Sequence, residues 1–85
     1  MKTTINKVWI DNDAVYIQTN KGEIFSEQFI DYPRLNAANN LQRSHFEYDN
    51  IGIRWKDLDE DLSYRGFMRE KSKNLNYPKI KSINI

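Results

Sequence analysis

Residues 5–25 read INKVWIDNDAVYIQTNKGEIF, and this stretch decides the fold. Polar and apolar residues alternate in three short runs, which is typical of strands with one buried face. The first break, Asp11 to Asp13, consists of residues that tolerate left-handed turn geometry. The second break contains Gly22, which supplies the positive φ of a tight turn. Residues 4–27 are therefore predicted to form an antiparallel meander of three strands.

The periodicity changes after this meander. Pro33 breaks a strand and can open a helical turn, while Asn39 or Asn40 can cap a second turn. Residues 31–44 are therefore predicted to form short helical pieces. Residues 46–55 then return to the composition of a strand.

Two further features shape the second half of the chain. Gly52, inside the predicted fourth strand, indicates a bulge or a close approach of two backbones. Ser63 or Asp61 can cap a short helix over residues 64–68. The predicted fold class is therefore α+β. Residues 1–68 form a single domain, in which short helices pack on a small antiparallel sheet made of the meander and the fourth strand.

The composition excludes several functional classes. The 85 residues carry 13 Lys and Arg against 12 Asp and Glu, so the net charge of +1 argues against an ordinary, strongly basic nucleic-acid binder. Without Cys and with a single His, His45, the chain lacks a thiol nucleophile and a Cys or His metal cluster. We see no signal peptide and no apolar run near the ~20 residues of a membrane span. We therefore expect a small cytoplasmic domain that is not an enzyme and needs no cofactor.

Charge is distributed unevenly along the chain. Residues 46–68 hold three basic and six acidic side chains, whereas residues 69–85 hold five basic and one acidic. The basic tail is predicted to be either disordered or a strand, because Ile83 and Ile85 alternate with polar residues. Four or five phosphate contacts would support only weak, salt-sensitive nucleic-acid binding. The candidate nucleic-acid-binding residues are Arg69, Lys71, Lys73, Lys79 and Lys81.

The acidic run Asp57, Asp59, Glu60 and Asp61 is open to several interpretations. Its three Asp residues stand at alternate positions and resemble the start of a calcium loop, but the Gly and the final Glu of such a loop are missing. A catalytic carboxylate pair would need a partner group that the sequence does not offer. The favoured interpretation is a structural loop that caps the next helix and pairs with Arg34 or Arg54. The alternative is an acidic surface that meets a basic protein.

Aromatic residues on the predicted strands, among them Trp9, Tyr16 and Trp55, are expected to pack in the core. Base stacking is the alternative, but it requires surrounding Lys and Arg, and residues 1–45 are neutral overall. His45 receives no role, because no nucleophile or metal set accompanies it.

Four segments resemble one known family: Tyr32-Pro33-Arg34-Leu35, Gly52-Ile53-Arg54-Trp55, Leu58-Asp59-Glu60-Asp61-Leu62-Ser63 and Gly66-Phe67-Met68. In this order they are similar to the bacterial domain-of-unknown-function family DUF2442, over residues 5–68. The most specific part is the string from Trp55 to Ser63. The chain departs from the family at Arg54, where His is common, at Lys56, where Pro is common, and in its tail.

The resemblance implies an α+β fold of a small antiparallel sheet with short helices, and no established activity. Some members look like the antitoxin half of a two-gene module. We therefore expect a protein-binding module whose partner-binding residues are Asp57, Asp59, Glu60, Asp61 and Arg34. The alternatives are a phage or mobile-element inhibitor of a host nucleic-acid enzyme, of the anti-CRISPR type, and a regulator that binds nucleic acid through its basic tail.

Overall fold

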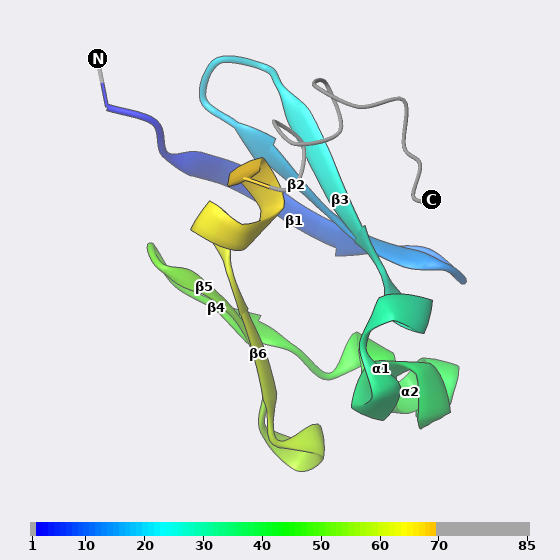
Figure 1. The fold of residues 1–85 in the computed structure, drawn as a ribbon. Coiled ribbons are helices and arrows are strands. Elements are labelled where there is room, and N and C mark those ends of the chain that lie inside the picture. The colour runs from blue at the N-terminus through cyan, green and yellow to red at the C-terminus, as the bar shows by residue number, and fades with distance from the viewer. Residues whose placement is uncertain (1, 70–85) are drawn as a thin grey trace.

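Two three-stranded antiparallel sheets face each other across one hydrophobic core, and short helices connect them (Figure 1). The computed structural model describes residues 2–69. The first sheet lies in the upper half of the view and the second in the lower half. The architecture confirms the predicted α+β class, but the sequence predicts one sheet where the structure has two.

The first sheet is the predicted meander, with the order β1 (Ile5–Ile10), β2 (Ala14–Thr19) and β3 (Ile24–Gln28). The turn between β1 and β2 is fixed by the Asp11 carboxylate, which accepts hydrogen bonds from the backbone N–H groups of Asp13 and Ala14 at 2.8 and 2.9 Å. Gly22 in the next turn has a φ of 86°, as its place in a tight turn requires.

The helical connection consists of three short pieces, as predicted: η1 (Phe29–Asp31), α1 (Pro33–Ala37) and α2 (Asn40–Ser44). Of the two candidate caps for α2, the structure selects Asn39. Its side chain accepts from the Gln42 backbone N–H at 2.8 Å, and the Gln42 side chain accepts from the Asn39 backbone N–H at 2.9 Å. This reciprocal capping box explains how so short a helix begins at a defined residue.

The prediction of one fourth strand was wrong. A complete second sheet forms instead, with the order β4 (Glu47–Tyr48), β5 (Gly52–Trp55) and β6 (Glu60–Ser63). β4 and β5 divide the predicted strand into a hairpin, because the Asp49 carboxylate accepts from the backbone N–H groups of Ile51 and Gly52 and holds a turn there. β6 begins at Glu60 and Asp61, the last two residues of the run that the sequence predicted to be an acidic loop.

The core consists of side chains that the two sheets and the helices turn toward each other. The fully buried members of this cluster are Val15, Ile17, Phe29, Leu35, Ile53, Trp55 and Phe67. Trp55 is 0% exposed, and its indole N–H donates to the Arg43 carbonyl at 2.9 Å, so the second sheet is bonded to α2 as well as packed on it. Indole burial with a satisfied N–H is the usual arrangement for a core Trp.

Arg43 joins three parts of the chain. Its guanidinium donates to the carbonyl oxygens of Leu35, Asn12 and Asn36 at 2.9, 3.2 and 3.1 Å, and it lies 4.6 Å from the centroid of the Phe29 ring. The planar fork of an Arg side chain suits such a set of acceptors, which a Lys ammonium cannot reproduce. Arg43 therefore fixes α1, α2 and the first turn relative to one another.

A third short helix follows β6 at residues 64–69. The Ser63 hydroxyl accepts from the Gly66 backbone N–H at 3.3 Å, which confirms Ser63 as the predicted cap. Tyr64 and Phe67 enter the core, with 4% and 1% of their surfaces exposed. Within residues 2–69, no helix is long and apolar enough to cross a membrane.

Candidate binding surface

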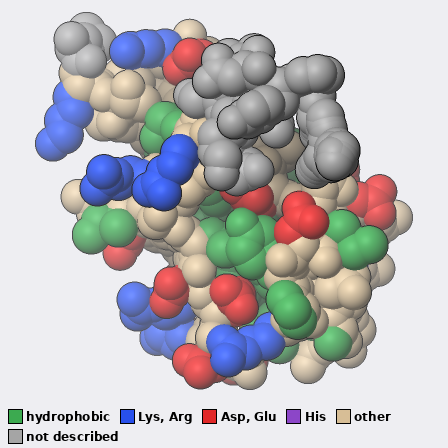
Figure 2. Space-filling model, in the orientation of Figure 1, with side chains coloured by type: hydrophobic (Ala, Val, Ile, Leu, Met, Phe, Trp, Pro, Cys, Tyr) green, Lys and Arg blue, Asp and Glu red, His purple; other side chains and the backbone are tan. Residues whose placement is uncertain are grey.

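The acidic residues 57–61 lie on three different pieces of structure. Asp57 belongs to η2 (Lys56–Leu58), Asp59 forms the following turn with a φ of 53°, and Glu60 and Asp61 begin β6. Because side chains alternate along a strand, Glu60 and Asp61 point to opposite faces of the second sheet. On the face shown in Figure 2, Asp and Glu side chains are scattered among Lys and Arg side chains in both the upper and the lower half.

Arg34 contacts the acidic residues, as the structural interpretation predicts. Its guanidinium donates to the Asp59 carbonyl at 2.6 Å and lies 3.8 Å from the Glu60 carboxylate. The Glu60 side chain is only 19% exposed, whereas that of Arg34 is 60% exposed. Arg34 therefore holds the turn in place from α1 and still presents much of its guanidinium to solvent.

The described residues of this run form neither a three-ligand metal site nor the cap of the next helix. Among the described residues, no group of three His, Asp or Glu side chains is placed to hold a metal ion. The helix at residues 64–69 is capped by Ser63, not by the acidic side chains, because β6 separates most of them from the helix start. Asp57, Asp59 and Asp61 are left exposed to solvent.

A row of alternating charges crosses the outer face of the second sheet. Arg54 stands directly opposite Glu47 on β4 and Asp61 on β6. Because its neighbours Ile53 and Trp55 are fully buried, Arg54 and its two partners point to the other, solvent-facing side. Glu47 is paired with Lys56 at 3.2 Å, but no ion pair joins Arg54 to Asp61 among residues 2–69.

An open hollow of about 240 Å³ lies in this region, lined by residues of all three strands, Arg54, Asp61 and Ser63 among them. Gly52 also lines it, and a Cβ atom at this position would lie 2.4 Å from the Leu62 carbonyl oxygen. The sequence prediction of a close backbone approach at Gly52 is therefore confirmed. Only glycine lets β5 and β6 meet at this point.

Two pKa shifts accompany the turn at the rim of the hollow. The backbone N–H groups of Ile51 and Gly52 lower the pKa of the Asp49 carboxyl, since they stabilise its charged form. Burial raises the pKa of the Tyr64 phenol to about 12, and this hydroxyl donates to the Asp49 carbonyl at 2.6 Å. The Asp49 carboxylate therefore fixes the β4–β5 turn, and the Tyr64 hydroxyl joins that turn to the last helix.

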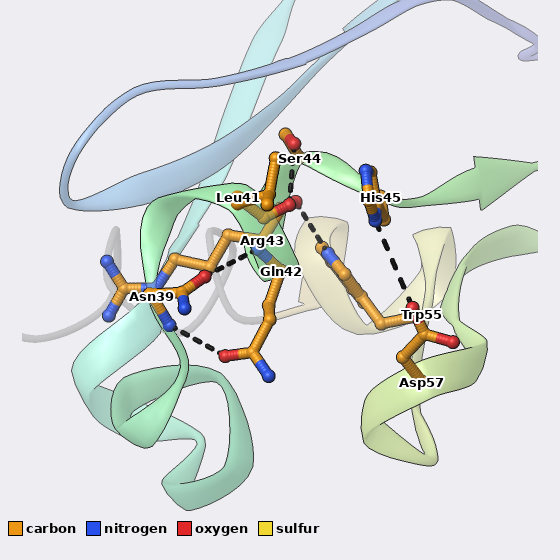
Figure 3. A network of polar contacts seen from close by, with 8 residues as sticks. All are labelled: Asn39, Leu41, Gln42, Arg43, Ser44, His45, Trp55 and Asp57. Atoms are coloured by element: carbon orange, nitrogen blue, oxygen red, sulfur yellow. Dashed lines mark hydrogen bonds and ion pairs between the residues drawn. The ribbon is translucent and has the colours of Figure 1, made fainter.

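The remaining polar residues near this surface make local contacts (Figure 3). His45, which received no role from the sequence, lies 3.9 Å from the Asp57 carboxylate, and both side chains are mostly exposed. Figure 3 also shows the buried Trp55 donating to the Arg43 carbonyl, so this aromatic side chain is a core residue. The contact between the mostly exposed His45 and Asp57 side chains contributes little to stability.

Trp9 and Tyr16, two more of the proposed stacking residues, lie on the first sheet outside the hydrophobic core, so the prediction that they pack in the core was wrong. Their rings stack on each other with centroids 5.4 Å apart, and the Lys7 ammonium lies 5.1 Å from the centroid of the Trp9 ring. The Tyr16 hydroxyl donates to the Asp11 carboxylate at 2.6 Å. These rings are thus already engaged within the chain, which leaves the base-stacking alternative without support from their arrangement.

The basic tail falls mostly outside the described residues. Arg69 is exposed at the end of the last helix, while Lys71, Lys73, Lys79 and Lys81 lie beyond residue 69. Sequence reasoning did not identify Glu47 and Ser63 as surface residues of one sheet face, and treated Arg54 only as a structural partner. One signal in the sequence could have indicated this charged row. Residues 47, 54 and 61 alternate in charge, and seven positions separate each from the next.

Comparison with known proteins gives a family and no further relatives. The model of the family described as "Protein of unknown function (DUF2442)" matches residues 5–73. No curated protein and no solved structure matches the chain. The match extends five residues beyond the segment in which the sequence resembled this family, and it covers well over half of the 85 residues. The chain therefore belongs to the DUF2442 family.

Proposed function

We propose that this chain is a non-enzymatic, cytoplasmic protein-binding module that neutralises a small basic protein, as an antitoxin does. The observation that carries the proposal is the display of Asp57, Asp59 and Asp61, all exposed, from a backbone that is held in place. Arg34 holds the Asp59 turn, and strand pairing with β5 holds Asp61. Charges fixed in this way attract an oppositely charged partner and select its orientation.

The fold does not use most of these carboxylates. Asp57 makes one weak contact, with His45 at 3.9 Å, and neither the Asp59 nor the Asp61 side chain makes an ion pair among residues 2–69. Three charged side chains that contribute little to folding are available for a partner. Glu60, in contrast, is mostly buried beside Arg34, and we assign it a supporting role.

The test is capture of the tagged full chain from the lysate of its own host, with and without nuclease, followed by mass spectrometry. We expect one small basic protein at about a 1:1 ratio that survives nuclease. Recovery of nucleic acid alone, lost on nuclease treatment, would contradict the proposal and favour the basic tail. A captured nucleic-acid enzyme whose binding is competed by DNA would favour an inhibitor that mimics phosphate.

A charge-removing variant then tests the surface. Asp57→Asn, Asp59→Asn and Asp61→Asn together keep the side-chain shapes, and Asn tolerates the left-handed φ of residue 59. We expect this variant to retain its Tm and to lose most of the captured partner. The matched control, Asp13→Asn, Glu23→Gln and Asp31→Asn, removes three exposed carboxylates elsewhere and should bind normally.

A further inference from the structure

The four outer strand edges of the two sheets differ in how well they are protected against pairing with another chain. β1 has an irregular register between Ile5 and Lys7, and β4 has only two residues. β3 carries Glu27, a charged residue that is only 7% exposed. Bulges, short strands and inward-pointing charges are the devices that block strand addition.

β6 has no bulge and is twice as long as β4, and its one inward-facing charge, Glu60, is paired with Arg34 at 3.8 Å. It pairs only with β5 within residues 2–69, and it has four residues in regular register. The Tyr64 backbone N–H donates to the Ile51 carbonyl, which continues the β5–β6 ladder. Because peptide groups alternate in direction along an antiparallel strand, those of Asp61 and Ser63 point away from β5, toward the open edge.

We infer that an extended basic segment of a protein partner adds to β6 as a fourth strand of the second sheet, with Lys or Arg opposite Asp61. This inference rests on the proposed function and names the partner's binding mode. Charges alternate across the row from Glu47 to Arg54 to Asp61, so a basic side chain is the complementary next member. The N–H and C=O groups of Asp61 and the N–H group of Ser63 provide three backbone hydrogen bonds, because the C=O of Ser63, at the helix N-cap, accepts the first bond of the helix.

The structure also specifies the pattern of the partner strand. Asp61 and Ser63 are exposed on the outer face, whereas Leu62 between them is 8% exposed and packs on the core. The added strand should therefore place an apolar residue opposite Leu62, between a basic and a polar residue. A second copy of β6 fits poorly, because Glu60 and Asp61 would bring acidic strands together on both sides of the contact.

The test uses the full ¹⁵N-labelled chain and an acetylated, amidated heptapeptide of alternating Lys and Val as the probe. We expect saturable shifts, and slowed amide exchange at Asp61 and Ser63 but not at Leu62. Asp61→Asn should weaken binding about two- to five-fold, the range of an exposed ion pair. The control Asp13→Asn removes the same charge in the turn between β1 and β2, and it should leave the affinity unchanged.

Several results would overturn the inference. Equal weakening by Asp13→Asn, or equal binding of the same peptide with Glu in place of Lys, would show unspecific attraction. Dimerisation of the free chain that protects the same two amides would assign the edge to a second copy. If the two amides are protected in the free chain and Lys79→Gln with Lys81→Gln removes that protection, the edge of β6 is assigned to this chain's own tail.

The binding mode and the proposed function can fail separately. A captured partner whose binding is insensitive to Asp61→Asn would refute the binding mode and leave the proposed function standing. Peptide binding supports the binding mode whether or not a partner is captured.

Discussion

Gly52→Ala adds a single methyl group at the point where β5 and β6 approach most closely. The new Cβ would lie 2.4 Å from the Leu62 carbonyl oxygen and 3.0 Å from the Ser63 Cα atom. An ordinary contact begins near 3.4 Å, so the two strands must separate locally by about 1 Å. Both obstacles are backbone atoms in a paired strand, and neither can rotate away as the end of a side chain could.

The expected cost follows from this geometry. Overpacking of a well-packed site costs about 1–3 kcal/mol. The lower entropy of the unfolded Ala chain offsets about 0.4–1 kcal/mol of that cost. We expect a net loss in the free energy of unfolding of about 1–2 kcal/mol, and for a domain of this size a Tm lower by about 4–16 °C. Thermal unfolding followed by circular dichroism measures this change in Tm directly.

Gly66→Ala is the matched control. Gly66 lies within the helix at residues 64–69, and a Cβ at this position would meet only the Ser63 hydroxyl oxygen, at 3.6 Å. Ala is favoured over Gly in a helix by about 1 kcal/mol, so this variant should raise the Tm. A Gly52→Ala protein as stable as the wild type, or a fall of equal size for both variants, would refute the reasoning.

Three further predictions concern the polar contacts of the fold. Arg43→Lys should lower the free energy of unfolding by about 1–3 kcal/mol in urea denaturation, because a Lys ammonium cannot reach all three carbonyl acceptors; an unchanged midpoint would contradict this. Asn39→Ala should cost about 1 kcal/mol by the same assay, through loss of the capping box, and Asn39→Ser should restore most of it. Tyr64 has a folded pKa of about 12 against an ordinary value of 10.0, so its contribution is complete below pH 10 and disappears as the pH rises toward 12. The stability difference between the wild type and Tyr64→Phe should therefore shrink over that interval by roughly 2–3 kcal/mol, and a constant difference would refute the shift.

Much of the fold could be predicted from local signals. Alternation and turn residues define the first sheet, because its central strand β2 has a buried face and Gly22 supplies the positive φ of a tight turn. Pro33 begins α1 as expected, and Ser63 caps the last helix. These features depend on residues close in sequence, which is why a single sequence reveals them.

β6 could not be predicted because its stability comes from distant residues. Its sequence, EDLS, contains one apolar side chain, and three polar neighbours usually indicate a loop. The strand exists because Leu62 pairs with Ile53 and enters the core, while Asp61 stands opposite Arg54 on the solvent-facing side of the sheet. For the same reason the run 57–61 looked like one loop, although Glu60 and Asp61 lie on β6 and point to opposite faces of the second sheet.

The core between the two sheets has a consequence for the nascent chain. Ile17, fully buried on the first sheet, belongs to the same core as Leu62, which follows it by 45 residues. At about 5–20 residues per second, the ribosome adds those residues over roughly 2–9 seconds. During that interval the first meander has no second sheet to cover its apolar face. Translation speed through residues 46–63 and chaperone contacts with residues 5–28 should therefore govern how much of this protein reaches its folded state.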